Sequence, residues 1–355
     1  MTADAAGGVW TYTLELVDAL AAEGVAVTVA VMGGRLTVGQ RRQAAASAAD
    51  TVHESAYALE WMGDPWSDVD QAGGWLLGLA DEVRPDVVHL HGYAHAALPW
   101  RAPTLVVGHS CVLSWWEAVR GEPASPEWEE YRRRVTAGLA AASAVVAPSA
   151  AMLGELRRWY GLDGGRVIPN CRRADWVVEA AKEPFVLGAG RVWDEAKNLA
   201  TLDRVATRLG RPVVVAGEQG HPHGGGSRLA AAHATGALPF DQLAGLLGRA
   251  AVFALPARYE PFGLAALEAA LSGCALVLGD IPSLREVWGD AATYVHPDDE
   301  DGLLAVLRRL LDDPSQAAAL GAAARRRAAR YTPAATAAAY LDAYRRLPVP
   351  AVSNP

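Results

Sequence analysis

The stretch ARYEPFGLAALEAALSGCAL, residues 257–276, places one glutamate in a turn and a second glutamate inside an apolar segment. Glu260 is followed at once by Pro-Phe-Gly, and Glu268 lies within a run of alanine and leucine. Proline stiffens such a turn, and the glycine after it frees the backbone to change direction. We therefore expect a helix from about Leu264 to Ser272, with one acid before it and one acid within it.

Short apolar runs of strand length alternate with amphipathic helical patterns along the whole chain. The runs that we predict to be buried parallel strands are GVAVTVAV (24–31), DVVHLH (86–91), TLVVGHS (104–110), SAVVAPS (143–149), FVLGAGR (185–191), RPVVVAGE (211–218), AVFALPA (251–257) and ALVLGD (275–280). Such alternation is typical of doubly wound α/β domains with parallel sheets. The sequence therefore predicts two Rossmann-like domains, residues 1–170 and 171–330, and a C-terminal helix in residues 331–355 that packs back toward the first domain.

The composition is that of a globular protein. The chain has 355 residues, of which 51% are hydrophobic and 20% are charged, which suits two domains with their own cores. Its formal net charge of −8 argues against nucleic acid as a partner, because phosphate binding needs a basic face.

Other features of the sequence predict a cytoplasmic location. Three scattered cysteines are typical of reduced thiols, and the start MTADAAGG lacks the pattern of a signal peptide. The apolar run at 25–32 is too short to span a membrane, so we expect no transmembrane segment, although contact with a membrane surface stays open.

Two cations follow a predicted strand in the segment GAGRVWDEAKN, residues 188–198. Arg191 and Lys197 lie at the carboxyl edge of the second sheet, where open α/β folds bind ligands. An arginine and a lysine together suit a diphosphate group. The alternative is that both are ordinary surface cations beside Asp194 and Glu195.

For each glutamate of the opening stretch, a role in ligand binding competes with a different structural explanation. Glu260 lies near a helix start, where free N–H groups favour a phosphate or sugar oxygen, but where an acid also stabilises the helix by itself. Glu268 lies on an apolar helix face, where its carboxylate must find a hydrogen-bond donor. A pair of ribose or sugar hydroxyls would supply such donors.

The first predicted domain offers further candidates. Gly7 and Gly8 would let the backbone approach a ligand, or they form a plain turn. His109, at the end of a strand, is placed for ligand contact or acid–base work, or is structural. Seven of the twelve tryptophans fall between residues 61 and 128, and we expect most of them to fill the core. The aromatic candidates for contact with an acceptor are Trp10, Trp115 and Trp116.

In their order and spacing, these segments resemble a retaining glycosyltransferase of family 4, whose fold is called GT-B. The resemblance covers nearly the whole chain and rests on GGVW (7–10), GHS (108–110), VVAPS (145–149), VIPN (167–170), GAGRVWDEAKN (188–198), YEPFGLAALEAALSG (259–273) and IPSLREVWG (281–289). It implies two Rossmann-like domains that face each other across a cleft. The expected activity is transfer of a sugar from a nucleotide-sugar donor, with UDP, GDP or ADP as the nucleotide, to an acceptor hydroxyl of a sugar, lipid or small molecule.

The resemblance also implies roles for residues of the second domain. Glu260 would lie by the donor sugar and the reacting centre, and Glu268 would bind the ribose. Arg191 and Lys197 would hold the diphosphate and stabilise it as it leaves, without a metal and without any further cofactor. The backbone at Phe262, Gly263 and Leu264 would touch the sugar and the distal phosphate. Whether Glu260 is a nucleophile or stabilises the sugar cation stays open.

In the first domain, the resemblance implies that Gly7 and Gly8 approach the phosphates and that His109 lies beside the donor sugar. Two other classes of function fit the same residues: a nucleotide-sugar-binding protein without catalysis, and a sugar-nucleotide epimerase on the same fold. A nicotinamide oxidoreductase is disfavoured because no GxGxxG motif follows a strand. The glycine-rich segment GHPHGGGSR, residues 220–228, is interpreted as a flexible surface loop.

Overall fold

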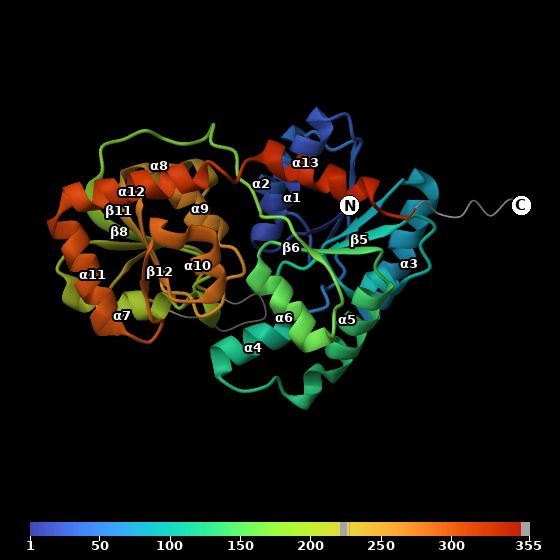
Figure 1. Cartoon of the computed structure of the whole chain (residues 1–355), viewed down its shortest axis with the longest axis horizontal. Coiled ribbons are helices and arrows are strands. Elements are labelled where there is room, and N and C mark those ends of the chain that lie inside the picture. Colours follow the sequence, from blue (N-terminus) through green and yellow to red (C-terminus); the bar gives the residue numbers. More distant parts are fainter. Residues whose placement is uncertain (221–225, 227, 349–355) are drawn as a thin grey trace, which may run out of the picture. The chain divides into compact units, whose positions relative to one another are not determined.

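A computed structural model describes residues 1–220, 226 and 228–348 of the chain. The glycine-rich segment 220–228, for which we predicted a surface loop, lies largely outside these residues. The chain forms two compact units (Figure 1). Unit 1 comprises Met1–Glu117, Glu122–Cys171 and the C-terminal segment that begins at Thr332, and unit 2 comprises Ala118–Gly121 and Arg172–Tyr331.

The strands of unit 1 are short, buried for the most part and all parallel. They are β1 (Thr2–Asp4), β2 (Thr28–Met32), β3 (Thr51–Glu54), β4 (Val88–Leu90), β5 (Thr104–Val107), β6 (Ala144–Ala147) and β7 (Arg166–Val167). Two sheets result, β1-β2-β3 and β4-β5-β6-β7. They adjoin where the Thr2 hydroxyl oxygen accepts the backbone N–H of His91, 2.8 Å away. The combined order, β3-β2-β1-β4-β5-β6-β7, is that of a Rossmann fold and reverses between β1 and β4.

Unit 2 repeats this order in one six-stranded parallel sheet. Its strands are β8 (Glu183–Ala189), β9 (Val213–Ala216), β10 (His233–Gly236), β11 (Ala250–Leu255), β12 (Ala275–Gly279) and β13 (Thr293–Val295). They lie in the order β10-β9-β8-β11-β12-β13, so the reversal falls between β8 and β11. In open α/β sheets, ligands bind outside the carboxyl ends of the strands at such a reversal.

Helices connect the strands in both units. Those of unit 1 and of the segment around it are α1 (Gly8–Ala22), α2 (Val38–Ala46), α3 (Trp66–Val83), α4 (Val112–Arg120), α5 (Glu129–Ala141), α6 (Ala150–Tyr160) and α13 (Pro333–Arg345). Those of unit 2 are α7 (Leu199–Leu209), α8 (Phe240–Arg249), α9 (Leu264–Leu271), α10 (Pro282–Trp288), α11 (Glu300–Asp312) and α12 (Pro314–Ala328). Short 3-10 turns are η1 (Ala94–Ala97), η2 (Pro126–Trp128), η3 (Glu195–Lys197) and η4 (Gly289–Ala291).

The helices of unit 2 lie on both faces of its sheet, with α8, α9 and α12 on one side and α7 and α11 on the other (Figure 1). In unit 1, the C-terminal helix α13 packs against α1, the first helix of the chain. A proline begins α13, and the Thr332 side chain accepts the N–H of Ala335, as at many helix starts. None of the helices in the described part of the chain is long and apolar enough to cross a membrane.

The elements match the sequence pattern closely. The helix expected from about Leu264 is α9, which ends at Leu271, and each of the eight apolar runs overlaps a strand. The strands β1, β3, β7, β10 and β13 were not predicted. One prediction needs refinement, because the glycine pair at residues 7–8 is part of a helix start rather than a free loop. Gly7 has a φ of +74° and caps α1, while Gly8 is its first residue.

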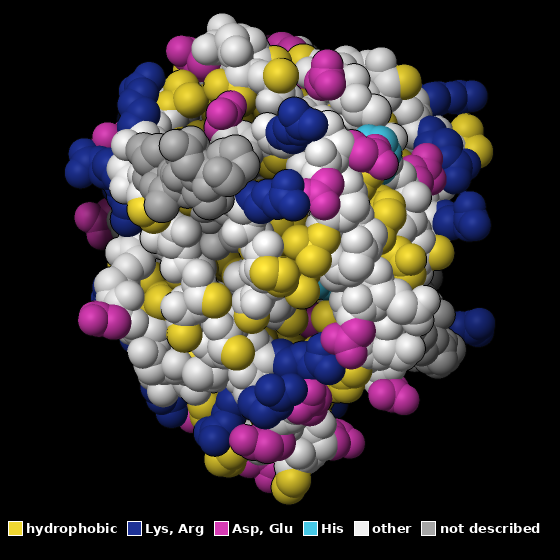
Figure 2. Space-filling model, turned by 90° about the vertical axis from the view of Figure 1, so that its right-hand side faces the viewer, with side chains coloured by type: hydrophobic (Ala, Val, Ile, Leu, Met, Phe, Trp, Pro, Cys, Tyr) yellow, Lys and Arg dark blue, Asp and Glu magenta, His cyan; other side chains and the backbone are white. Residues whose placement is uncertain are grey.

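Three of the seven tryptophans between residues 61 and 128 pack against a core cluster, as expected. Trp61, Trp75 and Trp100 lie against a buried cluster formed by Ala30, Met32, Leu59, Ala72 and Leu76. On the face of the molecule that Figure 2 shows, basic and acidic side chains lie side by side, with hydrophobic side chains in small groups between them. The described part of this face thus has mixed charge.

Candidate functional site

The loops that follow β8 and β11 are joined by hydrogen bonds at the carboxyl edge of the unit 2 sheet. The carbonyl oxygen of Ala196 accepts the N–H groups of Arg258 and Tyr259, at 2.8 and 3.4 Å. Asn198 adopts a left-handed φ of +55°, and its amide donates to the carbonyl oxygens of Pro256 and Pro297. These contacts fix the segment that carries Lys197 against the segment that carries Glu260.

Lys197 and Glu260 form an ion pair at this edge. The lysine Nζ lies 2.7 Å from Oε2 of Glu260, and the two side chains are only 18% and 14% exposed. The Ser283 hydroxyl donates to the carbonyl oxygen of Glu260 and holds its backbone. Two residues that are 63 positions apart in the sequence are therefore in direct contact at the reversal of strand order. A partly buried charge pair of this kind is a place where a ligand charge can be compensated.

Arg191 lies on the same loop with its own partner. Its Nη2 donates to Oδ2 of Asp194, at 2.7 Å, and its guanidinium lies 5.0 Å from the ring centre of Trp193. Asp194 is almost fully buried, while the Arg191 side chain is more than one third exposed. The sequence left open whether Arg191 is a surface cation beside Asp194, and the structure shows that contact. The guanidinium still has N–H groups to offer to an anion.

The backbone at this edge needs glycine at defined positions. A Cβ on Gly217 would lie 1.7 Å from the carbonyl oxygen of Gly190, so these two loops approach each other without side chains between them. Gly263 has a φ of +93° and precedes Leu264, the first residue of α9. The side chain of Phe262 is buried and contacts the ring of Tyr331 edge-on. At this turn it is therefore the backbone of residues 262–264, and not the Phe262 side chain, that is available for contact with a ligand.

Glu268 has a hydrogen-bond donor within the chain itself, and its binding of a ribose stays a prediction. The sequence suggested a carboxylate whose donors would come from a ribose or sugar. In the structure, Nε of Arg172 donates to Oε1 of Glu268 at 2.8 Å, and the side chains are 8% and 12% exposed. The Arg172 guanidinium also lies over the ring of Phe240, 4.4 Å from its centre. Arg172 was missed because it lies 96 residues away, in a linker with no periodic pattern.

In unit 1, histidines and tyrosines gather at the carboxyl edge of the sheet. His109 follows β5 and is half-buried, and its Nε2 lies 2.8 Å from Nδ1 of His91. The ring of Tyr12 packs edge-on against both rings, and its hydroxyl donates to the hydroxyl of Tyr340. Sequence reasoning found only His109, although the alternating pattern of the strand DVVHLH places His89 and His91 on one face.

Burial keeps these histidines neutral. It lowers the pKa of His109 to about 3 and lowers the pKa values of His89 and His91 well below the ordinary value. At neutral pH each of the three rings therefore has one N–H and one bare nitrogen. His109 is suited to hydrogen bonding with a ligand rather than to holding a charge.

The tryptophan candidates separate into two groups. Trp10 is 4% exposed, and its indole N–H donates to Oε1 of Gln43, so it is a core residue and not a surface for an acceptor. Trp115 and Trp116 are half-buried neighbours on α4, with ring centres 6.2 Å apart. Trp116 also lies against Trp128. Of the three candidates, Trp115 and Trp116 are the ones with partly exposed side chains.

Two acids at the edge of unit 1 were not found from the sequence. Asp4 ends β1, and burial, together with the charge of Glu60, raises its pKa to about 8. The carboxylate of Glu60 accepts the backbone N–H groups of Tyr93 and Ala94, at 2.9 and 2.8 Å. Glu60 therefore holds the turn that leads from β4 into η1.

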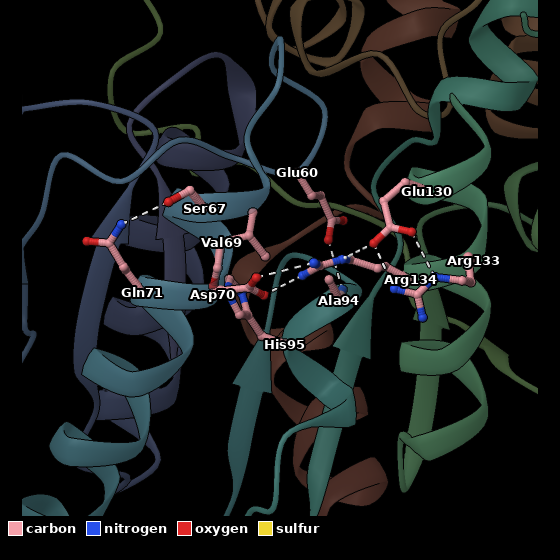
Figure 3. Close-up of polar contacts among 10 residues, drawn as sticks. All are labelled: Glu60, Ser67, Val69, Asp70, Gln71, Ala94, His95, Glu130, Arg133 and Arg134. Carbon is pink, nitrogen blue, oxygen red and sulfur yellow. Dashed lines mark hydrogen bonds and ion pairs between the residues drawn. The ribbon is translucent and has the colours of Figure 1, made fainter. Parts of the chain in front are cut away.

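Figure 3 shows the ion pairs that brace this turn from the outside. Arg134 on α5 contacts Asp70 on α3 and also Glu130 on its own helix, and Arg133 contacts Glu130. The ion pair between Arg134 and Asp70 links the helices on either side of η1. These charges compensate one another, so their first role is structural.

Comparison with protein families divides the chain in the same way as its two sheets. Residues 6–175 match the model described as Glycosyltransferase Family 4, and residues 180–327 match the model described as Glycosyl transferases group 1. Together the two matches cover most of the sequence.

Curated relatives agree with these families. Glycogen synthase of Mycobacterium tuberculosis is 31% identical over 270 residues, which are 66% of this chain and 62% of the relative. The match therefore spans less than two thirds of that protein. The MMP α-(1→4)-mannosyltransferase of Mycolicibacterium hassiacum is 43% identical over 83 residues, 22% of this chain and 20% of the relative.

Solved structures show the same fold at low sequence identity. Sucrose-phosphate synthase from Thermosynechococcus elongatus superimposes with a TM-score of 0.78 at 22% identity, covering 96% of this chain and 94% of the other. HepE of Anabaena, solved in complex with UDP-glucose, has a TM-score of 0.75 at 15% identity, covering 98% and 100%. The chain therefore belongs to the glycosyltransferases of the GT-B fold, with a family 4 domain followed by a group 1 domain.

Proposed function

We propose that this protein transfers a sugar from a nucleotide-sugar donor to an acceptor hydroxyl, with retention of the anomeric configuration and without a metal ion. The observation that supports this most is the ion pair of Lys197 and Glu260 at the reversal of strand order in unit 2. It places a cation and a carboxylate side by side where open α/β sheets bind ligands.

The chemistry of the reaction needs both charges. Breaking the bond between sugar and phosphate builds negative charge on the departing diphosphate and positive charge on the sugar ring. Lys197 and Arg191 would compensate the first charge, and Glu260 would stabilise the second or attack the anomeric carbon. A fixed cation at the diphosphate does the work that a metal ion does in other transferases, so a chelator should leave the rate unchanged.

The remaining predicted residues complete the donor site. The backbone from Phe262 to Leu264 and the helix start at Gly7 and Gly8 would lie against sugar and phosphates, and His109 would hydrogen-bond the sugar. Glu268 would bind the ribose. Trp115 and Trp116 would contact the acceptor. The donor is a UDP-, GDP- or ADP-sugar, and the site is expected to act in the cytoplasm.

A panel of UDP-, GDP- and ADP-sugars with sugar and lipid acceptors tests the proposal. We expect wild type to form a product in which the anomeric configuration of the donor is kept, as read by proton NMR. Glu260→Gln should lower kcat by about 10² to 10³. Glu183→Gln is the matched control, because Glu183 forms an exposed ion pair with Arg249 on the same unit. Equal rates for the two variants would contradict the assignment of the site.

The same experiment separates the other functions. A binding protein without catalysis would retain nucleotide-sugar in calorimetry and release no product with any acceptor. An epimerase would convert the donor in the absence of an acceptor.

A further inference from the structure

The rings of His91 and His109 contact each other at the carboxyl edge of the unit 1 sheet. His91 directly follows β4, and His109 follows β5 by two residues, so the adjacent parallel strands deliver both rings to one edge. Nδ1 of His91 lies 2.8 Å from Nε2 of His109, and the ring planes are 20° apart. Such a distance is that of a hydrogen bond between two ring nitrogens.

This hydrogen bond contains a single proton. Burial lowers the pKa values of both histidines, so both rings are neutral at pH 7. A neutral imidazole has one N–H, and its other nitrogen accepts. Either Nδ1–H of His91 donates to His109, or Nε2–H of His109 donates to His91. The choice decides whether His109 offers an N–H or a bare nitrogen at its free Nδ1.

The far nitrogen of His91 distinguishes the two arrangements. Nε2 of His91 is buried and has no hydrogen-bond partner among the described residues. The rings of His89 and Tyr12 lie beside it, with centres 4.9 and 5.6 Å from that of His91. If His109 donated, His91 would bury an unpaired N–H there. Unpaired buried N–H groups are rarer than unpaired buried acceptors, which favours His91 as the donor.

The backbone around His91 is held firmly enough to keep this geometry. The N–H of His91 donates to the hydroxyl oxygen of Thr2, and the N–H groups of Tyr93 and Ala94 donate to the buried Glu60. Figure 3 shows Glu60 above the N–H of Ala94. The backbone is therefore held at His91 itself and two and three residues after it.

We propose that His91 is a positioning residue that holds His109 in the tautomer with its proton on Nδ1. His109 then presents an N–H donor, not a bare nitrogen, on the side away from His91. The inference rests on the proposed function for one consequence only, which is that His109 donates a hydrogen bond to a hydroxyl oxygen of the donor sugar and does not act as a base.

Nitrogen-15 NMR of protein labelled in its histidine rings measures the tautomer directly. The His109→Asn variant assigns the His109 signals by their loss. We expect Nδ1 of His109 to carry the proton and Nε2 to have the chemical shift of a bare, hydrogen-bonded nitrogen. A wild-type spectrum with the proton on Nε2 overturns the proposal, and it does so without any variant.

Two substitutions at His91 test the cause. His91→Phe removes the donor, so His109 should become a mixture of its two tautomers. In His91→Asn, the side-chain amide N–H can replace Nδ1–H of His91 and should restore the wild-type signals. The matched control is His89→Phe, because His89 is also buried beside His91 and makes no hydrogen bond with His109. An unchanged tautomer in His91→Phe overturns the proposal. If that variant does not fold, the spectra of wild type and His91→Asn decide.

Kinetics provide the second readout. We expect His91→Phe to lower kcat about 2- to 5-fold, with the KM for the nucleotide-sugar unchanged, because only a fraction of the His109 rings then carries the proton on Nδ1. His91→Asn should recover most of that loss. If wild type transfers no sugar at all, the proposed function fails while the NMR result still decides the tautomer.

Discussion

The two units have the same strand order, but the edges where their sheets would bind ligands differ in chemistry. The edge of unit 2 carries paired charges: Lys197 with Glu260, and Arg191 with Asp194. The edge of unit 1 carries the neutral rings of His91, His109 and Tyr12, joined by hydrogen bonds and edge-on contacts. One backbone arrangement therefore supports two kinds of site. Charged groups suit a diphosphate, and neutral donors and acceptors suit the hydroxyls of a sugar.

If charge is what distinguishes unit 2, breaking its most buried ion pair should have the largest effect on stability. Arg172→Met removes the guanidinium beside Glu268, whose carboxylate is 12% exposed. We expect the free energy of unfolding, measured in urea, to fall by about 3 to 5 kcal/mol. The double variant Arg172→Met/Glu268→Leu should recover most of that loss, because no uncompensated charge stays buried.

The control for this prediction is the exposed pair of Arg41 and Glu54 in unit 1. Arg41→Met should change the free energy of unfolding by less than about 1 kcal/mol, because water already screens that pair. Equal losses for Arg172→Met and Arg41→Met would contradict the role of burial.

The second prediction concerns the cation of the proposed donor site. Lys197→Met should lower kcat about 10² to 10³-fold, because the diphosphate then leaves without its nearest fixed charge. Because Lys197 acts on the diphosphate and Glu260 on the sugar, Lys197→Met/Glu260→Gln should be slower than Glu260→Gln alone. Arg211→Met is the control, since Arg211 contacts only Asp312 in an exposed pair. A rate for Lys197→Met within a factor of three of wild type would refute the role of this lysine.

The smallest difference between wild type and a variant is expected in acid, and it should come from a histidine of unit 1. Burial holds the pKa values of His89, His91 and His109 below the ordinary value near 6.5. As the pH falls below 6.5, histidines of the unfolded chain bind protons, whereas the buried histidines of the native protein do not. The free energy of unfolding therefore decreases between pH 6.5 and about 3. Each histidine contributes at most about 1.4 kcal/mol per pH unit to this slope.

Unfolding in urea between pH 7 and pH 5.5 measures that slope. His89→Phe lacks one of the three groups, so its stability should fall less steeply than that of wild type by up to about 1.4 kcal/mol per pH unit. If the free energy of unfolding falls equally with pH in both proteins, His89 is protonated in the native state as readily as in the unfolded chain, and the prediction fails.

Much of the candidate site could be predicted from the sequence because its residues stand at the ends of strands. Lys197 and Glu260 each follow a run that is apolar throughout, and parallel strands bring their carboxyl ends to one edge. The same reasoning found His109. It could not find Arg172, which lies in a linker without periodicity. It also did not show that Trp10, a candidate for acceptor contact, is buried, because a tryptophan near a helix start has no pattern that reveals its burial.

Sequence patterns were enough to place eight of the strands and the helix α9, since apolar periodicity and glycine or proline at turns act between near neighbours in the chain. They missed the strands β1, β3, β7, β10 and β13. Which side chains form hydrogen bonds or ion pairs with each other could be seen only in the tertiary structure. The contact of Glu268 with Arg172 spans 96 positions, and that of His91 with His109 depends on the register between β4 and β5. Such contacts are set by the packing of whole sheets and helices, and hydrogen bonds form over only about 3 Å.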